Sequence, residues 1–120
     1  MRNSDFRNLQ IWKLSKDLCV EMYQVTGSFP DAEKFGIISQ IRRAALSVPS
    51  NIAEGHGRSS DADFARFLYM SLGSIKELET LLEISVELEF IHSCEDLVNR
   101  LQQISKMTSS LIKTLKPDSH

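Results

Sequence analysis

The chain has 120 residues, is 42% hydrophobic and 25% charged, and carries a formal net charge of −2. These values are typical of one soluble globular domain and argue against a disordered chain, and no stretch approaches the roughly 20 apolar residues of a membrane span. Residues 1–60 carry eight Lys/Arg and six Asp/Glu, whereas residues 61–120 carry six and ten, so the balance disfavours wholesale nucleic-acid binding but allows a basic patch in the first half.

The N-terminal residues Met1–Asp5 lead into an amphipathic segment and not into the apolar core of a signal peptide. This start predicts a cytoplasmic protein without a membrane partner. Helical periodicity then fills a single domain, residues 1–120. The first predicted helix covers residues 8–26, with Asn8 as its capping residue and with Gly27 and Pro30 ending it.

The second predicted helix covers residues 32–56 and contains Pro49. Proline removes a backbone donor and clashes with the preceding turn, yet Ile52 stays in phase with Ala45 and Val48. We therefore predict one helix that is kinked at Pro49 rather than two separate helices.

The third predicted helix covers residues 61–89, after Ser60 as its cap, and its apolar arc is broader than a surface helix needs. The fourth predicted helix covers residues 94–115. Ser93 marks its start, and Pro117 ends it. No alternating pattern predicts a strand, and the three connections are short. The expected fold is therefore all-α, an antiparallel up-down-up-down four-helix bundle.

No pattern predicts a catalytic, metal or cofactor site. The string Glu89-Phe90-Ile91-His92 has the Glu-x-x-His spacing of di-metal bundles, but nothing elsewhere completes such a site. No serine lies in a nucleophile elbow, and no glycine-rich loop follows a strand. Cys19 and Cys94 fall in apolar helical patterns and are predicted to be buried free thiols, with a disulfide or metal pair as an alternative that their spacing does not support.

The second predicted helix carries an unusual polar stripe, whose members recur three and four residues apart: Gln40, Arg43, Ser47, Ser50, Asn51 and Glu54. A solvated surface is one interpretation. Serine and asparagine are poor mid-helix residues, however, so close approach to the small residues Ser71, Gly73 and Ser74 is the other, within one subunit or between two. Asn51 is also expected to bond carbonyls that Pro49 leaves free.

An acidic stripe on the third predicted helix consists of Glu79, Glu83 and Glu87. Solvation explains it, and pairing with Lys106, Lys113 or a neighbouring subunit is the alternative. The wide apolar arc of this helix would expose surface that soluble monomers avoid, which predicts a homo-oligomer.

Three runs resemble the four-helix-bundle proteins encoded in intervening sequences of bacterial 23S ribosomal RNA genes. They are Gln40–Gly55 followed by Gly57-Arg58, Phe64–Leu82 with Gly73–Glu79, and Leu9–Trp12. The resemblance spans nearly the whole chain. It implies an antiparallel bundle, a homopentamer, and shared structural or assembly positions at Arg42, Arg43, Pro49, Asn51, Glu54, Gly55 and Arg58.

Related bundles serve as accessory factors of diversity-generating retroelements and bind nucleic acid through a basic surface. The resemblance therefore implies that RNA or DNA is a partner of this chain. Arg42, Arg43, Arg58 and Arg66 are the candidate phosphate contacts. Gln40, Ser47, Ser71 and Ser74 are further candidates for assembly. The expected function is that of a non-enzymatic, nucleic-acid-associated accessory protein. A protein-interaction scaffold, with a protein partner and no nucleic acid, is the alternative.

Overall fold

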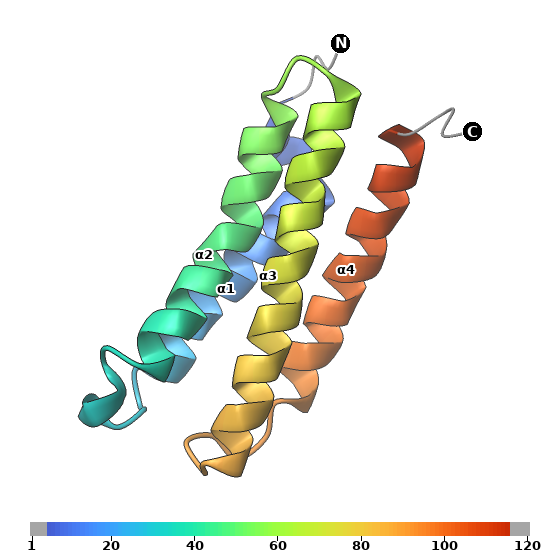
Figure 1. The fold of residues 1–120 in the computed structure, drawn as a ribbon. Helices are drawn as coiled ribbons and strands as arrows, with labels where there is room; N and C mark the ends of the chain where they lie inside the picture. The colour runs from blue at the N-terminus through green and yellow to red at the C-terminus, as the bar shows by residue number, and fades with distance from the viewer. Residues whose placement is uncertain (1–4, 116–120) are drawn as a thin grey trace.

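The computed structural model describes residues 5–115, which form four packed helices and no strand. The helices are α1 (Gln10–Thr26), α2 (Ile37–His56), α3 (Asp61–Glu87) and α4 (Glu95–Leu115); two 3₁₀ turns, η1 (Phe6–Asn8) and η2 (Asp31–Glu33), precede α1 and α2. The described part measures 47 × 24 × 20 Å, and the helices lie along its long axis (Figure 1). The predicted all-α bundle is confirmed.

Successive helices in the bundle run in opposite directions, as Figure 1 shows. Contacts between α2 and α3 follow this order, because residues late in α2 meet residues early in α3. Gly55 packs on Phe67, whereas Ser47, two turns earlier, meets Ser74. The start of α1 and the end of α4 therefore lie at the end of the bundle where α2 connects to α3 (Figure 1).

The first helix begins two residues later than Asn8, and Asn8 is not its cap. Leu9 occupies the capping position of α1 without a side-chain hydrogen bond. Asn8 instead closes η1, where the Asp5 carboxylate accepts a hydrogen bond from the Arg7 backbone N–H at 3.0 Å. The side-chain cap thus belongs to the short turn η1, and α1 starts only after this turn.

The second helix begins at Ile37 and not at residue 32. Gly36 has φ −110° and ψ −115°, outside the helical region, and it separates η2 from α2. From Ile37 onward the helix continues through Pro49 to His56 without interruption. The kink at Pro49 stays a prediction.

The third helix ends at Glu87, slightly before the predicted boundary at Glu89. Glu89 has φ 64°, its N–H donates to the Val86 carbonyl, and the Phe90 N–H donates to the Ser85 carbonyl. This pair of hydrogen bonds is the Schellman motif, which closes a helix with a left-handed residue. At the start of α4, the Ser93 hydroxyl accepts a hydrogen bond from the Glu95 N–H at 3.3 Å, and Pro117 lies outside the described residues.

The core runs along the bundle axis and takes apolar side chains from all four helices. Three of its buried hydroxyls form hydrogen bonds within their own helix: Thr26, Ser85 and Thr108 each donate to the carbonyl four residues earlier, at 2.7–2.8 Å. Both cysteines are buried and free, and burial raises the pKa of the Cys19 and Cys94 thiols. Within residues 5–115, no helix combines the length and apolar character that a membrane crossing requires.

Candidate nucleic-acid interface

Four polar side chains form what we call the α2–α3 polar seam: Ser47, Asn51, Ser71 and Ser74. The Ser74 hydroxyl donates to the Ser47 hydroxyl at 2.8 Å, and the Ser71 hydroxyl donates to the Val48 carbonyl at 2.9 Å. The Asn51 amide donates to the Ser47 hydroxyl at 2.8 Å and to the Ser47 carbonyl at 2.9 Å. These small residues therefore meet one another within one subunit, and they let the two helices approach closely.

Asn51 does not take the carbonyl that Pro49 leaves without an N–H partner. That carbonyl belongs to Ala45, four residues before the proline, whereas both hydrogen bonds of the Asn51 amide go to Ser47. The side chain of Asn51 thus anchors the seam and does not repair the gap in the hydrogen-bond ladder of α2.

Further along the polar stripe lies a small hollow between α2 and α3, with a volume of about 140 Å³. Gln40, Arg43 and Ser47 of α2 line it together with Ser74 and Glu77 of α3. Arg43 is exposed and forms no hydrogen bond or ion pair within residues 5–115. Among the four candidate arginines, it is therefore the one whose charge is not paired within the described residues.

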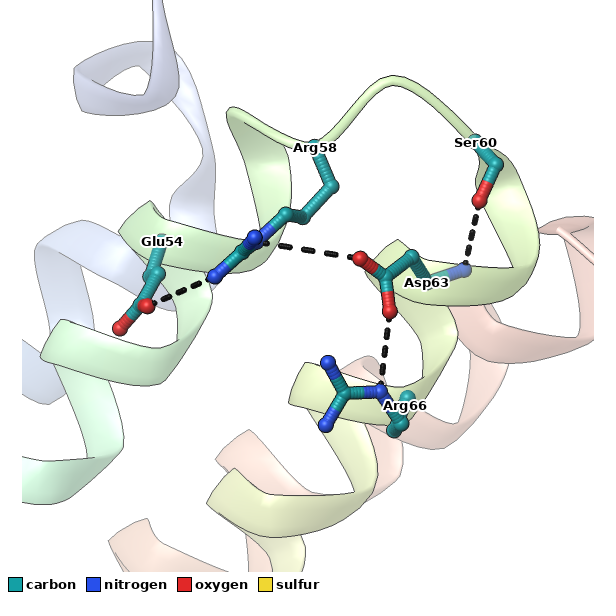
Figure 2. Close-up of polar contacts among 5 residues, drawn as sticks. All are labelled: Glu54, Arg58, Ser60, Asp63 and Arg66. Carbon is teal, nitrogen blue, oxygen red and sulfur yellow. Dashed lines mark hydrogen bonds and ion pairs between the residues drawn. The ribbon is translucent and has the colours of Figure 1, made fainter.

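The turn between α2 and α3 holds an ion-pair cluster, shown in Figure 2. Arg58 contacts Glu54 at 2.9 Å and Asp63 at 3.8 Å, and Arg66 contacts the same Asp63 at 2.9 Å. The Ser60 hydroxyl caps α3 by accepting a hydrogen bond from the Asp63 N–H at 3.1 Å. Each arginine thus faces a carboxylate of its own chain.

Both guanidinium groups of this cluster also lie over the ring of Phe67, with Arg58 and Arg66 each 4.6 Å from its centroid. Phe67 is buried, so the two arginines cover an edge of the core. Two guanidinium groups and the two carboxylates of Glu54 and Asp63 leave little net charge at this point. The cluster is arranged to hold the turn, and it offers little attraction to a phosphate.

Arg42 binds the last turn of α1. Its Nε donates to the Thr26 hydroxyl at 2.9 Å, its Nη2 donates to the Tyr23 carbonyl at 3.1 Å, and its guanidinium lies 4.5 Å from the centroid of the Tyr23 ring. A cation at the C-terminal end of a helix satisfies carbonyls that have no partner in the helix and complements the dipole. The structure therefore places Arg42 in the α1–α2 contact.

A basic groove between α3 and α4 was not predicted from the sequence. It has a volume of about 550 Å³, and its lining residues are Leu72, Gly73, Lys76, Ser105, Lys106, Ser109, Ser110 and Lys113. We call it the α3–α4 groove. Three lysines from two helices border it. Lys106 and Lys113 are seven residues apart on α4 and so share a face, but only the packing of α4 on α3 brings them beside Lys76.

In the described part of the chain, the acidic stripe of α3 reaches Lys76 but neither Lys106 nor Lys113. Lys76 Nζ lies 4.0 Å from Glu79 Oε2, at the limit of an ion pair. Within residues 5–115, no ion pair joins Lys106 or Lys113 to Glu83 or Glu87. The groove therefore keeps a local excess of positive charge on an otherwise acidic chain.

No metal centre is visible in the described part of the chain. Residues 5–115 contain no group of three or more His, Cys, Asp and Glu side chains placed to hold an ion. Glu89 lies in the turn after α3 and His92 is exposed before α4. They are not in the bundle core, where the di-metal sites of bundles lie.

Comparison with known proteins identifies the family. The sequence profile of the 23S rRNA-intervening sequence proteins matches residues 7–110. The chain belongs to this family. A crystal structure similar to this intervening-sequence protein is that of a protein of unknown function from the S23 ribosomal protein family of Bacteroides thetaiotaomicron, with 28% identity and a TM-score of 0.76 over 86% of this chain and 98% of that one. No curated protein is significantly similar to this family member.

Proposed function

We propose that this intervening-sequence protein is a non-enzymatic, homo-oligomeric bundle that acts as an RNA- or DNA-associated accessory protein. The observation that carries the proposal is the α3–α4 groove, where Lys76, Lys106 and Lys113 converge beside serine hydroxyls. The family description refers to ribosomal RNA, and the similar Bacteroides protein is assigned to a ribosomal protein family. Both descriptions agree with a phosphate-bearing partner.

Lysines act on phosphates as point charges, and they release condensed counterions when they bind. Three lysines that each neutralise one phosphate give a slope of about −2 in a plot of log K against log salt for a single strand. One groove on a chain of net charge −2 therefore binds weakly. A homo-oligomer, a pentamer by family resemblance, repeats the groove and multiplies the affinity through multivalency.

The test is fluorescence anisotropy with labelled RNA and DNA between 20 and 200 mM salt, roughly the range over which phosphate contacts lose most of their strength. The variant Lys106→Gln/Lys113→Gln is expected to make the slope shallower by about 1.4. Lys13→Gln/Lys34→Gln is the matched control, because it removes the same charge from exposed lysines outside the groove. Absence of salt-sensitive binding by the wild type at low salt would overturn the proposal.

The candidate arginines are expected to contribute unequally. Arg43, which is exposed on the neighbouring hollow, is the one expected to weaken binding when it is changed to Gln. Arg42, Arg58 and Arg66 use their guanidinium groups within the chain. Changes at these three positions should lower the stability of the fold more than they lower the affinity for nucleic acid.

A protein-interaction scaffold is the second candidate function, because Met70 and Ile84 of α3 and the residue after the helix, Leu88, are exposed apolar side chains. A scaffold without nucleic acid predicts a protein partner that remains bound after nuclease treatment. Loss of every partner on that treatment would count against it.

A further inference from the structure

One exposed aromatic side chain, Tyr69, lies on the same face of α3 as the residues of that helix that line the α3–α4 groove. Tyr69 precedes Leu72 by three residues, Gly73 by four and Lys76 by seven, so these side chains share one face of α3. Its side chain is 50% exposed. Because α3 and α4 run in opposite directions (Figure 1), Tyr69 lies level with the end of α4 that carries Lys113, at one end of the groove.

Gly73 keeps the middle of the groove open. A Cβ built at this position would have no atom within 4 Å, so no close packing within the chain requires a glycine there. Glycine is the least favourable residue of a helix interior after proline. Its effect is to let another backbone approach α3 between Tyr69 and Lys76.

The opposite wall of the groove offers hydrogen-bonding groups. Ser105, Ser109 and Ser110 line it together with Lys106 and Lys113. The Ser105 hydroxyl is shielded from solvent and has no hydrogen-bond partner within the described residues, unlike the core hydroxyls of Thr26 and Thr108. Hydroxyls and ammonium groups in alternation are suited to the oxygens of a phosphodiester chain.

Acidic side chains limit the length of the basic surface. Glu79, Glu83 and Glu87 continue along α3 beyond Lys76, and a phosphate chain would be repelled there. The stretch from Lys106 to Lys113 spans about 10 Å at 1.5 Å per residue, which leaves room for only a few phosphates. The site is therefore short and has a defined end.

We propose that the α3–α4 groove binds a single-stranded segment of nucleic acid, with its phosphates on Lys76, Lys106 and Lys113 and one base stacked on Tyr69. This inference rests on the proposed function and specifies the form of the partner. An aromatic platform beside a basic groove is the arrangement that selects single strands, because only an unpaired base exposes its face for stacking. A duplex presents its phosphates but leaves Tyr69 without a base.

The experiment compares a labelled 12-nucleotide RNA without self-complementarity with the same strand annealed to its complement, by anisotropy at 50 mM salt. Tyr69→Leu is expected to weaken binding of the single strand by roughly 5- to 100-fold, from the usual contribution of one stacked base. It should leave duplex binding unchanged. Tyr69→Phe keeps the ring and should bind the single strand as the wild type does.

Gly73→Leu supplies a second, independent measurement. Its Cβ meets open space, so the variant should fold with unchanged or higher thermal stability, yet its side chain fills the groove and should weaken binding of the single strand. Gly73→Ala is the smaller control. Wild-type affinity in Tyr69→Leu, or duplex binding as tight as that of the single strand, would overturn this inference and leave the proposed function standing. No salt-sensitive binding to either probe would overturn both.

Discussion

At Gly55, the backbone of α2 comes so close to α3 that a side chain does not fit. A Cβ at this position would lie 2.6 Å from the Phe67 Cβ and 3.0 Å from Phe64 Cδ1. The first of these atoms is fixed by the backbone of α3, so it cannot swing away. Gly55 thus sets the spacing of the two helices at the end where the ion-pair cluster of Figure 2 holds their connection.

We predict that Gly55→Ala destabilises the protein by about 1–3 kcal/mol, the usual cost of overpacking, despite the better helix propensity of alanine. Gly73→Ala is the matched control. It makes the same substitution in an open position and should stabilise by up to about 1 kcal/mol. Urea unfolding of both variants measures the two changes. Effects of the same sign would contradict the assignment of Gly55 to a close helix contact.

The residues that sequence patterns misplaced lie at helix ends. Asn8 is a favourable capping residue, yet Asp5 caps the turn η1, which includes Asn8, and α1 starts later. Glu89 continues the helical pattern but adopts φ 64°, a conformation that usually belongs to glycine or asparagine. At these positions the conformation is decided by the path of the chain between helices and not by the preference of the single residue. The periodicity of apolar residues does not specify that path.

At the scale of elements, α4 is tied to α1 by a two-point ion pair. Both guanidinium Nη atoms of Arg100 contact the carboxylate of Glu21, and Arg100 also reaches Asp96 at 3.4 Å. The hydrogen bonds from Arg100 lower the pKa of Glu21 below its ordinary value of 4.5. Both side chains are more than one-third exposed, so the contribution of this pair to folding is less than about 1 kcal/mol.

We predict that Glu21→Gln lowers the free energy of unfolding at pH 7 and that the difference from the wild type vanishes in acid. Because the pKa of Glu21 is lower in the folded protein, its stabilisation is fully present above pH 4.5 and is lost as the pH falls through the folded-state pKa. Urea unfolding at pH 7 and pH 3 measures it, with Glu87→Gln as an exposed control. A difference that persists undiminished at low pH would assign the effect to something other than ionic pairing.

The helices themselves could be predicted because each has a long apolar stripe, whereas the α3–α4 groove could not. Lys76 is 30 or more residues from Lys106 and Lys113 along the chain, and their meeting depends on how far α4 lies from α3. The sequence places Ser47 and Ser74 on polar faces, and it leaves open whether they meet within one subunit. The structure supplies that answer through the 2.8 Å hydrogen bond between their hydroxyls.

At the scale of the whole molecule, apolar side chains remain exposed after the four helices have packed. Met70, Ile84 and Leu88 are 45%, 42% and 51% exposed. Ile84 and Leu88 follow Met70 by 14 and 18 residues, which is about four and five helical turns, so the three side chains share the outer face of α3. The polar seam and the ion-pair cluster are satisfied within the chain, and we expect a second copy to cover this apolar face of α3.

We predict that the protein is a homo-oligomer at micromolar concentration, with a mass near five times that of the 13.6 kDa chain if the family resemblance extends to its assembly. Ile84→Glu/Leu88→Glu places charges on the outer face of α3 and should reduce the mass measured by light scattering while circular dichroism stays helical. Val20→Glu is the control, because it adds a charge at an exposed apolar position of α1. A wild type with the mass of one chain would contradict the prediction, and a pentamer unaffected by the α3 variant would move the interface to another face of the bundle.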